Sequence, residues 1–143
     1  DIAALKSILA NRKLRIGAYG DPAAAPYSVW EPLVAAAMGH TGYTHQWERE
    51  DFDPRILDLV MASADTKAQA AKLKLQGKRY FRVKRDTDAP IAGEIECLSD
   101  SVGKSCADCL LCDGTQRGKG KSVYINVHGS KAANFNPDLI AVA

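Results

Sequence analysis

The chain has 143 residues, 46% of them hydrophobic, and a formal net charge of +2. This length and composition suit one domain with a hydrophobic core and argue against a disordered or low-complexity protein. No apolar run approaches the roughly 20 residues that a transmembrane helix needs, and no leader peptide pattern is visible. We therefore expect a cytoplasmic protein that has no membrane partner.

The N-terminal part of the chain alternates between helical and extended patterns. Apolar residues at helical spacing predict a helix over residues 2–12, and the stretch "LRIGAY" predicts a strand over residues 14–19. After a loop with one glycine and two prolines, Ser28 and Glu31 form a capping-box pattern that opens a helix ending near Met38.

The same alternation continues to the end of the chain. Residues 41–47 predict a second strand, and residues 53–59 predict a helix start that leads into an apolar strand over residues 59–63. Residues 65–77 are rich in Ala, Leu, Lys and Gln, which predicts a helix that ends at Gly77. Two further strands are predicted over residues 79–85 and 121–129.

Strands that are separated by helices form βα units, and their crossovers make neighbouring strands parallel. We therefore predict a single α/β domain over residues 1–143, built on a parallel sheet or a partial (β/α) barrel. Residues 86–120 contain all four cysteines and are predicted to form a metal-binding loop before the last strand. Because the chain starts at Asp1 with a helical pattern, we expect it to be the C-terminal part of a longer chain.

Ligands of parallel sheets gather at the carboxyl ends of the strands. His45 is the best single candidate for chemistry, although a base, a ligand and a packed structural histidine all remain open interpretations. Asp21 and Asp65 each follow a strand, but no spacing shows that they meet, and cap or turn roles are the simpler interpretation. The candidates for lining a pocket at these strand ends are Tyr19, Asp21, His45, Trp47 and Ser63.

The four cysteines have the pattern Cys97-x8-Cys106-x2-Cys109-x2-Cys112, which in a cytosolic chain indicates a metal site before disulfides. Zinc sites usually take their ligands from two separate C-x2–4-C pairs, so a triple run with one remote thiol fits zinc less well. A C-x2-C-x2-C run with one distant cysteine is typical of bacterial [4Fe–4S] ferredoxins. The pattern therefore favours a [4Fe–4S] cluster over zinc, and free or disulfide-bonded thiols rank third.

Two further features bear on the choice of metal and partner. His128 follows the last predicted strand, and in a zinc site it is an alternative to Cys97 as the fourth ligand. Residues 67–85 contain eight basic and no acidic side chains, a charge pattern that attracts nucleic acid. A solvated helix face and a half-exposed strand are the simpler interpretation of this run.

Several blocks carry a resemblance to a known family. The stretches "LRIGAYGDPAAAPYSVWEPL", "GYTHQW", "LVMASADTKAQA", "RYFRVKR" and "CADCLLCDG" followed by "KSVYINVHG" resemble an uncharacterised protein family of bacteriophages and prophages. The resemblance runs from about Leu14 to Gly129 and implies a further N-terminal segment with cysteines of its own. More distantly, it implies similarity to radical S-adenosylmethionine enzymes with an auxiliary iron–sulfur site.

The C-x3-C-x2-C loop that holds the catalytic cluster of those enzymes is absent from the 143 residues. The resemblance therefore implies only an auxiliary or structural cluster on Cys97, Cys106, Cys109 and Cys112, in the cytoplasm of a host cell. Three hypotheses follow: a metal-cluster protein on a partial barrel with an unknown reaction, a zinc-stabilised module that binds nucleic acid, and a protein that binds a host factor.

Overall fold

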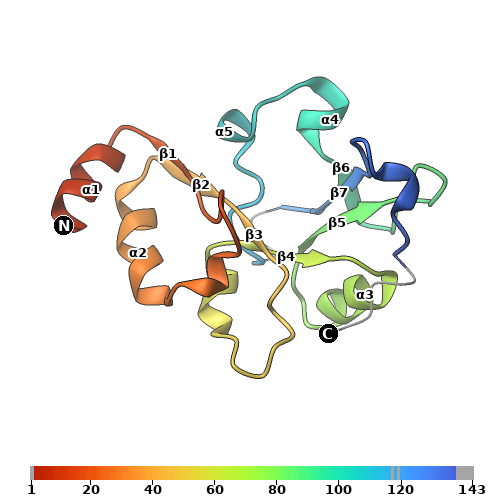
Figure 1. The fold of residues 1–143 in the computed structure, drawn as a ribbon, viewed down its shortest axis with the longest axis horizontal. Helices are drawn as coiled ribbons and strands as arrows, with labels where there is room; N and C mark the ends of the chain where they lie inside the picture. Colours follow the sequence, from red (N-terminus) through yellow and green to blue (C-terminus); the bar gives the residue numbers. More distant parts are fainter. Residues whose placement is uncertain (1, 117, 119, 138–143) are drawn as a thin grey trace.

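The computed structural model describes residues 2–116, 118 and 120–137, and its elements follow the predicted alternation of helices and strands (Figure 1). No helix among these residues combines the length and the apolar character that crossing a bilayer requires. The elements before the second half of the sheet are α1 (Ile2–Leu9), β1 (Lys13–Arg15), η1 (Pro22–Ala24), α2 (Tyr27–Ala36), β2 (Gly39–Thr41), β3 (Tyr43–Thr44), η2 (Pro54–Asp58) and β4 (Met61–Ala64). They are followed by α3 (Lys67–Leu75), β5 (Tyr80–Lys84), β6 (Glu94–Glu96), α4 (Leu98–Val102), α5 (Cys106–Cys109), β7 (Ser122–Asn126) and η4 (Ala132–Asn134).

All strand pairs between these elements are parallel, as the βα alternation predicts. A five-stranded sheet has the order β3-β4-β5-β7-β6, and β1 pairs with β2 in a separate ladder. Gly42 lies between β2 and β3, where its amide donates to the carbonyl of Cys112 at 2.9 Å and its carbonyl accepts from Met61 at 3.0 Å. The strand predicted over residues 41–47 is therefore divided at Gly42 into β2 and β3, because the amide of Gly42 bonds to Cys112 in the cysteine segment.

The helices of the βα units cover one face of the sheet. Tyr80 of β5 and two alanines of β4 pack against Ala70 and Leu73 of α3. Ile16, which follows β1, packs with Val60 in a second cluster that the aromatic and aliphatic side chains of α2 cover. Paired residues of neighbouring strands point to the same side of a sheet, so these two clusters lie on one face.

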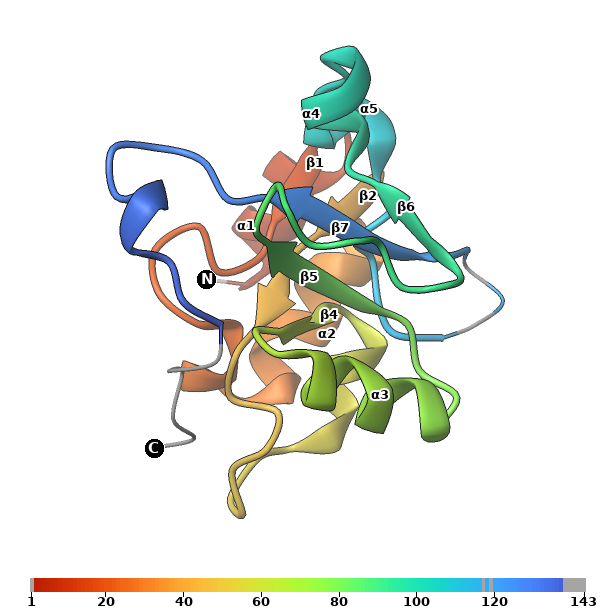
Figure 2. The same ribbon diagram turned by 90° about the vertical axis from the view of Figure 1, so that its right-hand side faces the viewer.

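The opposite face of the sheet carries the cysteine-rich segment instead of a βα helix. Phe81, Val123 and Ile125 alternate with residues of the helix-covered face and point away from α3. Figure 2 shows α4 and α5 on the far side of the sheet from α3. In the described residues the five-stranded sheet is open, with β3 and β6 at its edges, so the parallel sheet is confirmed and closure into a barrel is not.

Three local predictions differ from the structure. The Ser28–Glu31 capping box is wrong, because α2 begins at Tyr27 directly after Pro26 and its N-cap makes no side-chain hydrogen bond. Where the structure describes it, the predicted loop over residues 86–120 contains one short strand and two short helices rather than irregular chain alone. The helix start predicted over residues 53–59 is the 3-10 helix η2 (Pro54–Asp58), capped by the Asp53 carboxylate, which accepts from the amide of Arg55 at 3.0 Å.

Candidate metal centre

Cys97 enters the site from the edge of the sheet. Its amide donates to the carbonyl of Tyr124 in β7 at 2.7 Å, which continues the β6–β7 pairing to Cys97, the N-cap of α4. α4 is only five residues long and ends at Gly103, whose φ of 68° allows the chain to reverse direction. The chain then returns over the sheet with the other three cysteines.

Cys106 and Cys109 are the first and last residues of α5. The hydroxyl of Ser105 accepts from the amide of Asp108 at 3.1 Å, which caps the N-terminus of this short helix. Leu110 ends the helix with a φ of 53°, the one positive φ of a non-glycine residue among those described. Its side chain lies against Gly39 of β2, where an added Cβ would come within 2.6 Å of Leu110 Cδ1. The absence of a side chain at Gly39 thus lets Leu110 pack against β2, and this contact holds the end of α5 on the sheet.

Arg79 fixes the chain after Cys112. This buried guanidinium donates from Nε to the carbonyl of Gly114 at 2.9 Å and from Nη2 to the carbonyl of Leu111 at 2.5 Å. Nη2 also contacts the carboxylate of Asp113 at 2.6 Å. Burial lowers the pKa of Arg79, while Asp113 and Cys112 partly oppose this effect. These three polar contacts of one buried side chain therefore set the position of the last cysteine.

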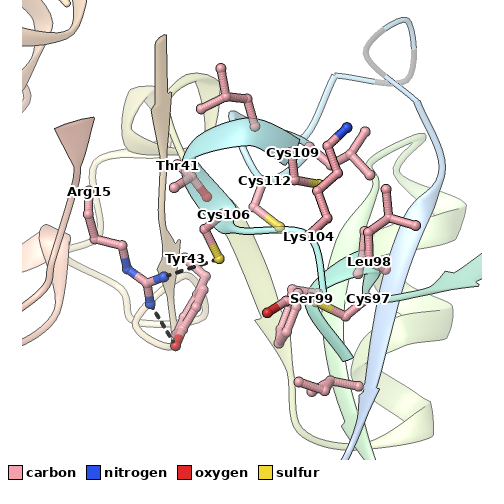
Figure 3. A pocket seen from close by; sticks show the side chains of 15 residues that line it. Arg15, Thr41, Tyr43, Cys97, Leu98, Ser99, Lys104, Cys106, Cys109 and Cys112 are labelled. Carbon is pink, nitrogen blue, oxygen red and sulfur yellow. Dashed lines mark hydrogen bonds between the residues drawn. The ribbon is translucent and has the colours of Figure 1, made fainter. Parts of the chain in front are cut away.

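The four cysteines line one cavity of about 150 Å³ (Figure 3). Its walls are mainly apolar side chains from the uncovered face of the sheet and from the cysteine segment, and its basic residues are Arg15 and Lys104. Cys106 is exposed, the other three cysteines are partly buried, and all four are free thiols. The apolar lining consists of Phe81, Leu98, Leu110, Leu111, Val123 and Ile125, with Thr41, Tyr43 and Ser99 as polar contributions.

The four thiols line the cavity but do not form a compact set of ligands for one ion. Among the described residues, no group of three or more His, Cys, Asp or Glu side chains is arranged so that it could hold a metal ion. His128 is exposed and does not line the cavity, so it does not replace Cys97 beside the other cysteines. The predicted grouping of all four cysteines is thus present, while a ready-made site for a single ion is not.

Ionisation of the Cys112 thiol is unfavourable in the cavity. Burial raises the pKa of Cys112 to about 12, and the thiols of Cys97, Cys109 and Cys106 add to this effect. Arg79 acts in the opposite direction but does not outweigh them. Like charges in an apolar cavity repel, so four thiolates require cations between them.

The residues predicted to line a pocket at the strand ends have different outcomes. Tyr19 is fully exposed, and Trp47 is buried in the helix-covered core, where its Nε1 donates to the carbonyl of Ser63 at 2.8 Å. Asp21 caps η1 by accepting from the amide of Ala23. Asp21 lines a separate cavity with Gln46 and Phe52, whereas Tyr19, His45, Trp47 and Ser63 line none of the cavities described here, so a shared pocket stays a prediction.

Asp21 and Asp65 nevertheless meet at His45, which sequence spacing did not show. Nδ1 of His45 lies 2.9 Å from Oδ2 of Asp65, and the amide of His45 donates to Asp21 at 2.8 Å. The hydrogen bond to Asp65 raises the pKa of His45, against the opposing effect of burial. The ring of His45 also lies edge-on to Tyr43, 6.2 Å between centroids, and Tyr43 lines the cysteine cavity. The His45–Asp65 pair is therefore adjacent to the candidate metal centre.

Most basic side chains of residues 67–85 contact other groups of the same chain. Arg82 forms a buried ion pair with Glu94, Lys72 contacts Glu48, and Arg85 contacts Asp88. Lys74 donates to the carbonyl of Ala92. Together with Arg79 and Lys84, six of the eight basic side chains contact groups of the same chain. Arg79, Arg82 and Lys84 are buried, whereas the three lysines of α3 are exposed, so binding of nucleic acid by this run stays a prediction.

Sequence reasoning missed the residues that wall the cavity. Arg15, Tyr43 and Phe81 contribute to it, and none was singled out because isolated strand residues carry no motif. One signal was available: both alternating sets of β5 side chains are large, with Tyr80 and Arg82 on one face and Phe81 and Val83 on the other. A strand with bulky side chains on both faces indicates that both faces are covered.

No family model matches the chain, and neither the curated proteins nor the solved structures contain a significant match.

Proposed function

We propose that the protein carries a [4Fe–4S] cluster on Cys97, Cys106, Cys109 and Cys112. The observation that supports this most is that all four thiols line one apolar cavity without converging on a single point. A cubane takes one thiolate at each of its four irons, so its ligands surround a volume. The cavity of about 150 Å³ is far larger than the roughly 10–15 Å³ of cavity volume that one water molecule needs.

A single zinc ion fits this arrangement less well. Zinc binds thiolates at about 2.3 Å in a tetrahedron, which brings neighbouring sulfurs to about 3.8 Å from each other. Among the described residues, no three cysteine, histidine or carboxylate side chains are arranged in that way. Zinc binding would require the cysteine segment to close over the cavity, whereas the contacts of Arg79, Gly39 and Gly42 hold it in place.

The surroundings of the thiols suit an anionic cluster. Thiolate ligands make such a centre negatively charged, and Arg15 and Lys104 place positive charge at the cavity. Apolar walls restrict water, which together with hydrogen bonds to sulfur sets the reduction potential of an iron–sulfur centre. When bound, the cluster would supply one-electron transfer or structural stabilisation of the segment from Cys97 to Cys112.

The wider context of this proposal comes from the family resemblance of the sequence. We propose a phage-type protein of the host cytoplasm in which this cluster is auxiliary or structural, on a sheet similar to that of radical S-adenosylmethionine proteins. Sheets of this kind bind substrates at the carboxyl ends of their strands. The His45–Asp65 pair lies there beside the cavity, and it is the group available to hold or transfer a proton.

The test is the metal content of protein purified without oxygen. Four irons and four acid-labile sulfides per chain, with visible charge-transfer absorbance, would support the proposal. Replacing Cys97 or Cys112 with Ser should remove most of the iron, because each would leave one corner of the cluster without its thiolate. One zinc per chain, or iron content that is unchanged in these variants, would overturn it.

A further inference from the structure

Arg15 approaches the candidate metal centre from the end of β1 (Figure 3). Its Nη1 donates to Sγ of Cys106 at 4.0 Å, and its Nη2 donates to the hydroxyl of Tyr43 at 3.1 Å. The guanidinium carbon also lies 5.1 Å from the centroid of the Tyr43 ring. One exposed arginine thus contacts both a ligand thiol and an aromatic side chain of the cavity wall.

Tyr43 holds this arginine in position although the arginine is exposed. The ring of Tyr43 stacks on Phe81 with 5.3 Å between centroids and 9° between planes. Both rings line the cavity. Stacking between two wall residues restrains the phenol, and the phenol then restrains the guanidinium by a hydrogen bond and by cation–π attraction.

We infer that Arg15 sets the reduction potential of the cluster through Cys106, an inference that rests on the proposed function. Reduction adds one negative charge to the centre, and a fixed cation near a sulfur stabilises that charge. An N–H donor to the same sulfur acts in the same direction. Cys106 is also the exposed thiol of the four, so it is the corner where solvent would otherwise dominate.

Two lysines also place positive charge near this corner. Lys104 lines the cavity, and Lys13 lies 3.6 Å from the carboxylate of Asp108 on the same short helix as Cys106. Asp108 is negatively charged, so its pairing with Lys13 leaves little net charge there. Among the described residues, Arg15 is the basic residue whose side chain donates to a ligand sulfur.

The experiment is a redox titration of anaerobically reconstituted wild type and four variants, followed by electron paramagnetic resonance. Arg15→Met removes both the charge and the donor, Arg15→Lys keeps the charge, and Tyr43→Phe removes only the hydroxyl anchor. Arg55→Met is the matched control, because exposed Arg55 also lies over a tyrosine ring, Tyr27, at 4.9 Å but does not line the cysteine cavity. Iron and sulfide content are measured in each preparation.

We expect Arg15→Met to shift the equilibrium toward the oxidised cluster by about tenfold, which is about 59 mV for one electron. Arg15→Lys and Tyr43→Phe should give smaller shifts in the same direction, and Arg55→Met none. A wild-type potential in Arg15→Met with full iron content would overturn the inference alone. If Arg15→Met does not assemble the cluster, equal potentials in Arg15→Lys, Tyr43→Phe and wild type would overturn it. Iron-free wild type would overturn both this inference and the proposed function.

Discussion

Replacing Glu94 with Gln would leave the guanidinium of Arg82 without its carboxylate inside the protein. Arg82 donates from Nε and Nη2 to the two carboxylate oxygens at 2.7 and 2.6 Å, and the amide of Ile91 donates to the same carboxylate at 2.8 Å. The side chains are 3% and 0% exposed. Glu94 is the first residue of β6, which leads directly to Cys97, so this ion pair also anchors the start of the cysteine segment.

The expected loss in the free energy of unfolding follows from the burial of both side chains. Removing one partner of a buried ion pair destabilises a protein by about 3–5 kcal/mol, and Gln keeps one acceptor oxygen, so we expect about 3 kcal/mol for Glu94→Gln. Replacing both residues by Met removes both charges and should cost less than the single change. The matched control is Asp88→Asn, which breaks the more exposed pair with Arg85 and should destabilise the protein much less than Glu94→Gln.

The pH dependence of the effect has a definite sign. Burial opposes ionisation of Glu94, but the hydrogen bonds from Arg82 and from the amide of Ile91 outweigh it and lower the pKa of Glu94. A carboxylate whose pKa is lowered by folding stabilises the protein above its unfolded pKa of about 4.3, and this contribution disappears as the pH falls through the folded pKa. The difference between wild type and Glu94→Gln should therefore be full at pH 7 and shrink in acid.

The assay is urea denaturation followed by circular dichroism at several pH values. A cost of Glu94→Gln below about 1 kcal/mol at pH 7 would refute the reasoning, because it would mean that Arg82 is hydrated or finds another partner. A double Met variant that is less stable than Glu94→Gln would refute it as well.

Two further predictions test other parts of the structure. Gly114→Ala should lower the free energy of unfolding by about 2–3 kcal/mol, since φ is 134° and the added Cβ would lie 2.5 Å from the carbonyl oxygen of Asp58. The control Gly93→Ala, with a φ of 95° and open space around the added Cβ, should lower it less. Equal losses of stability in urea denaturation would contradict the steric argument. His45→Gln should cost less than about 1 kcal/mol, because the ring is 48% exposed. The hydrogen bond to Asp65 raises the pKa of His45, so that cost should be full below pH 6.5 and vanish as the pH rises through the folded pKa; a cost that grows with pH would refute the pairing.

The strand and helix periodicities were sufficient to predict the α/β class and the parallel pairing. The helix over residues 65–77 and the strand over residues 79–85 were placed to within two residues, since each has a strong pattern and a clear stop. β6 was missed because it is only three residues long, and its place beside β7 depends on the buried Arg82–Glu94 pair. Such long-range pairing leaves no periodic signal in a single sequence.

The candidate site, like the fold, was predictable from the sequence only in part. The spacing of the cysteines predicts one shared site, and all four do line one cavity, while their binding to one metal centre stays a prediction. The cavity wall was not predictable, since Tyr43 and Phe81 become neighbours only when their strands are assembled. Trp47 was predicted at the strand ends but is buried, because its side chain turns into the core to donate to Ser63.

The most direct test of the central claim is the iron and sulfide content of the wild-type protein isolated without oxygen, together with its visible spectrum. The account predicts four irons and four sulfides per chain in a brown wild-type protein, and a Cys112→Ser variant that has lost most of the colour. A colourless protein that contains no iron, with or without one bound zinc, would contradict it.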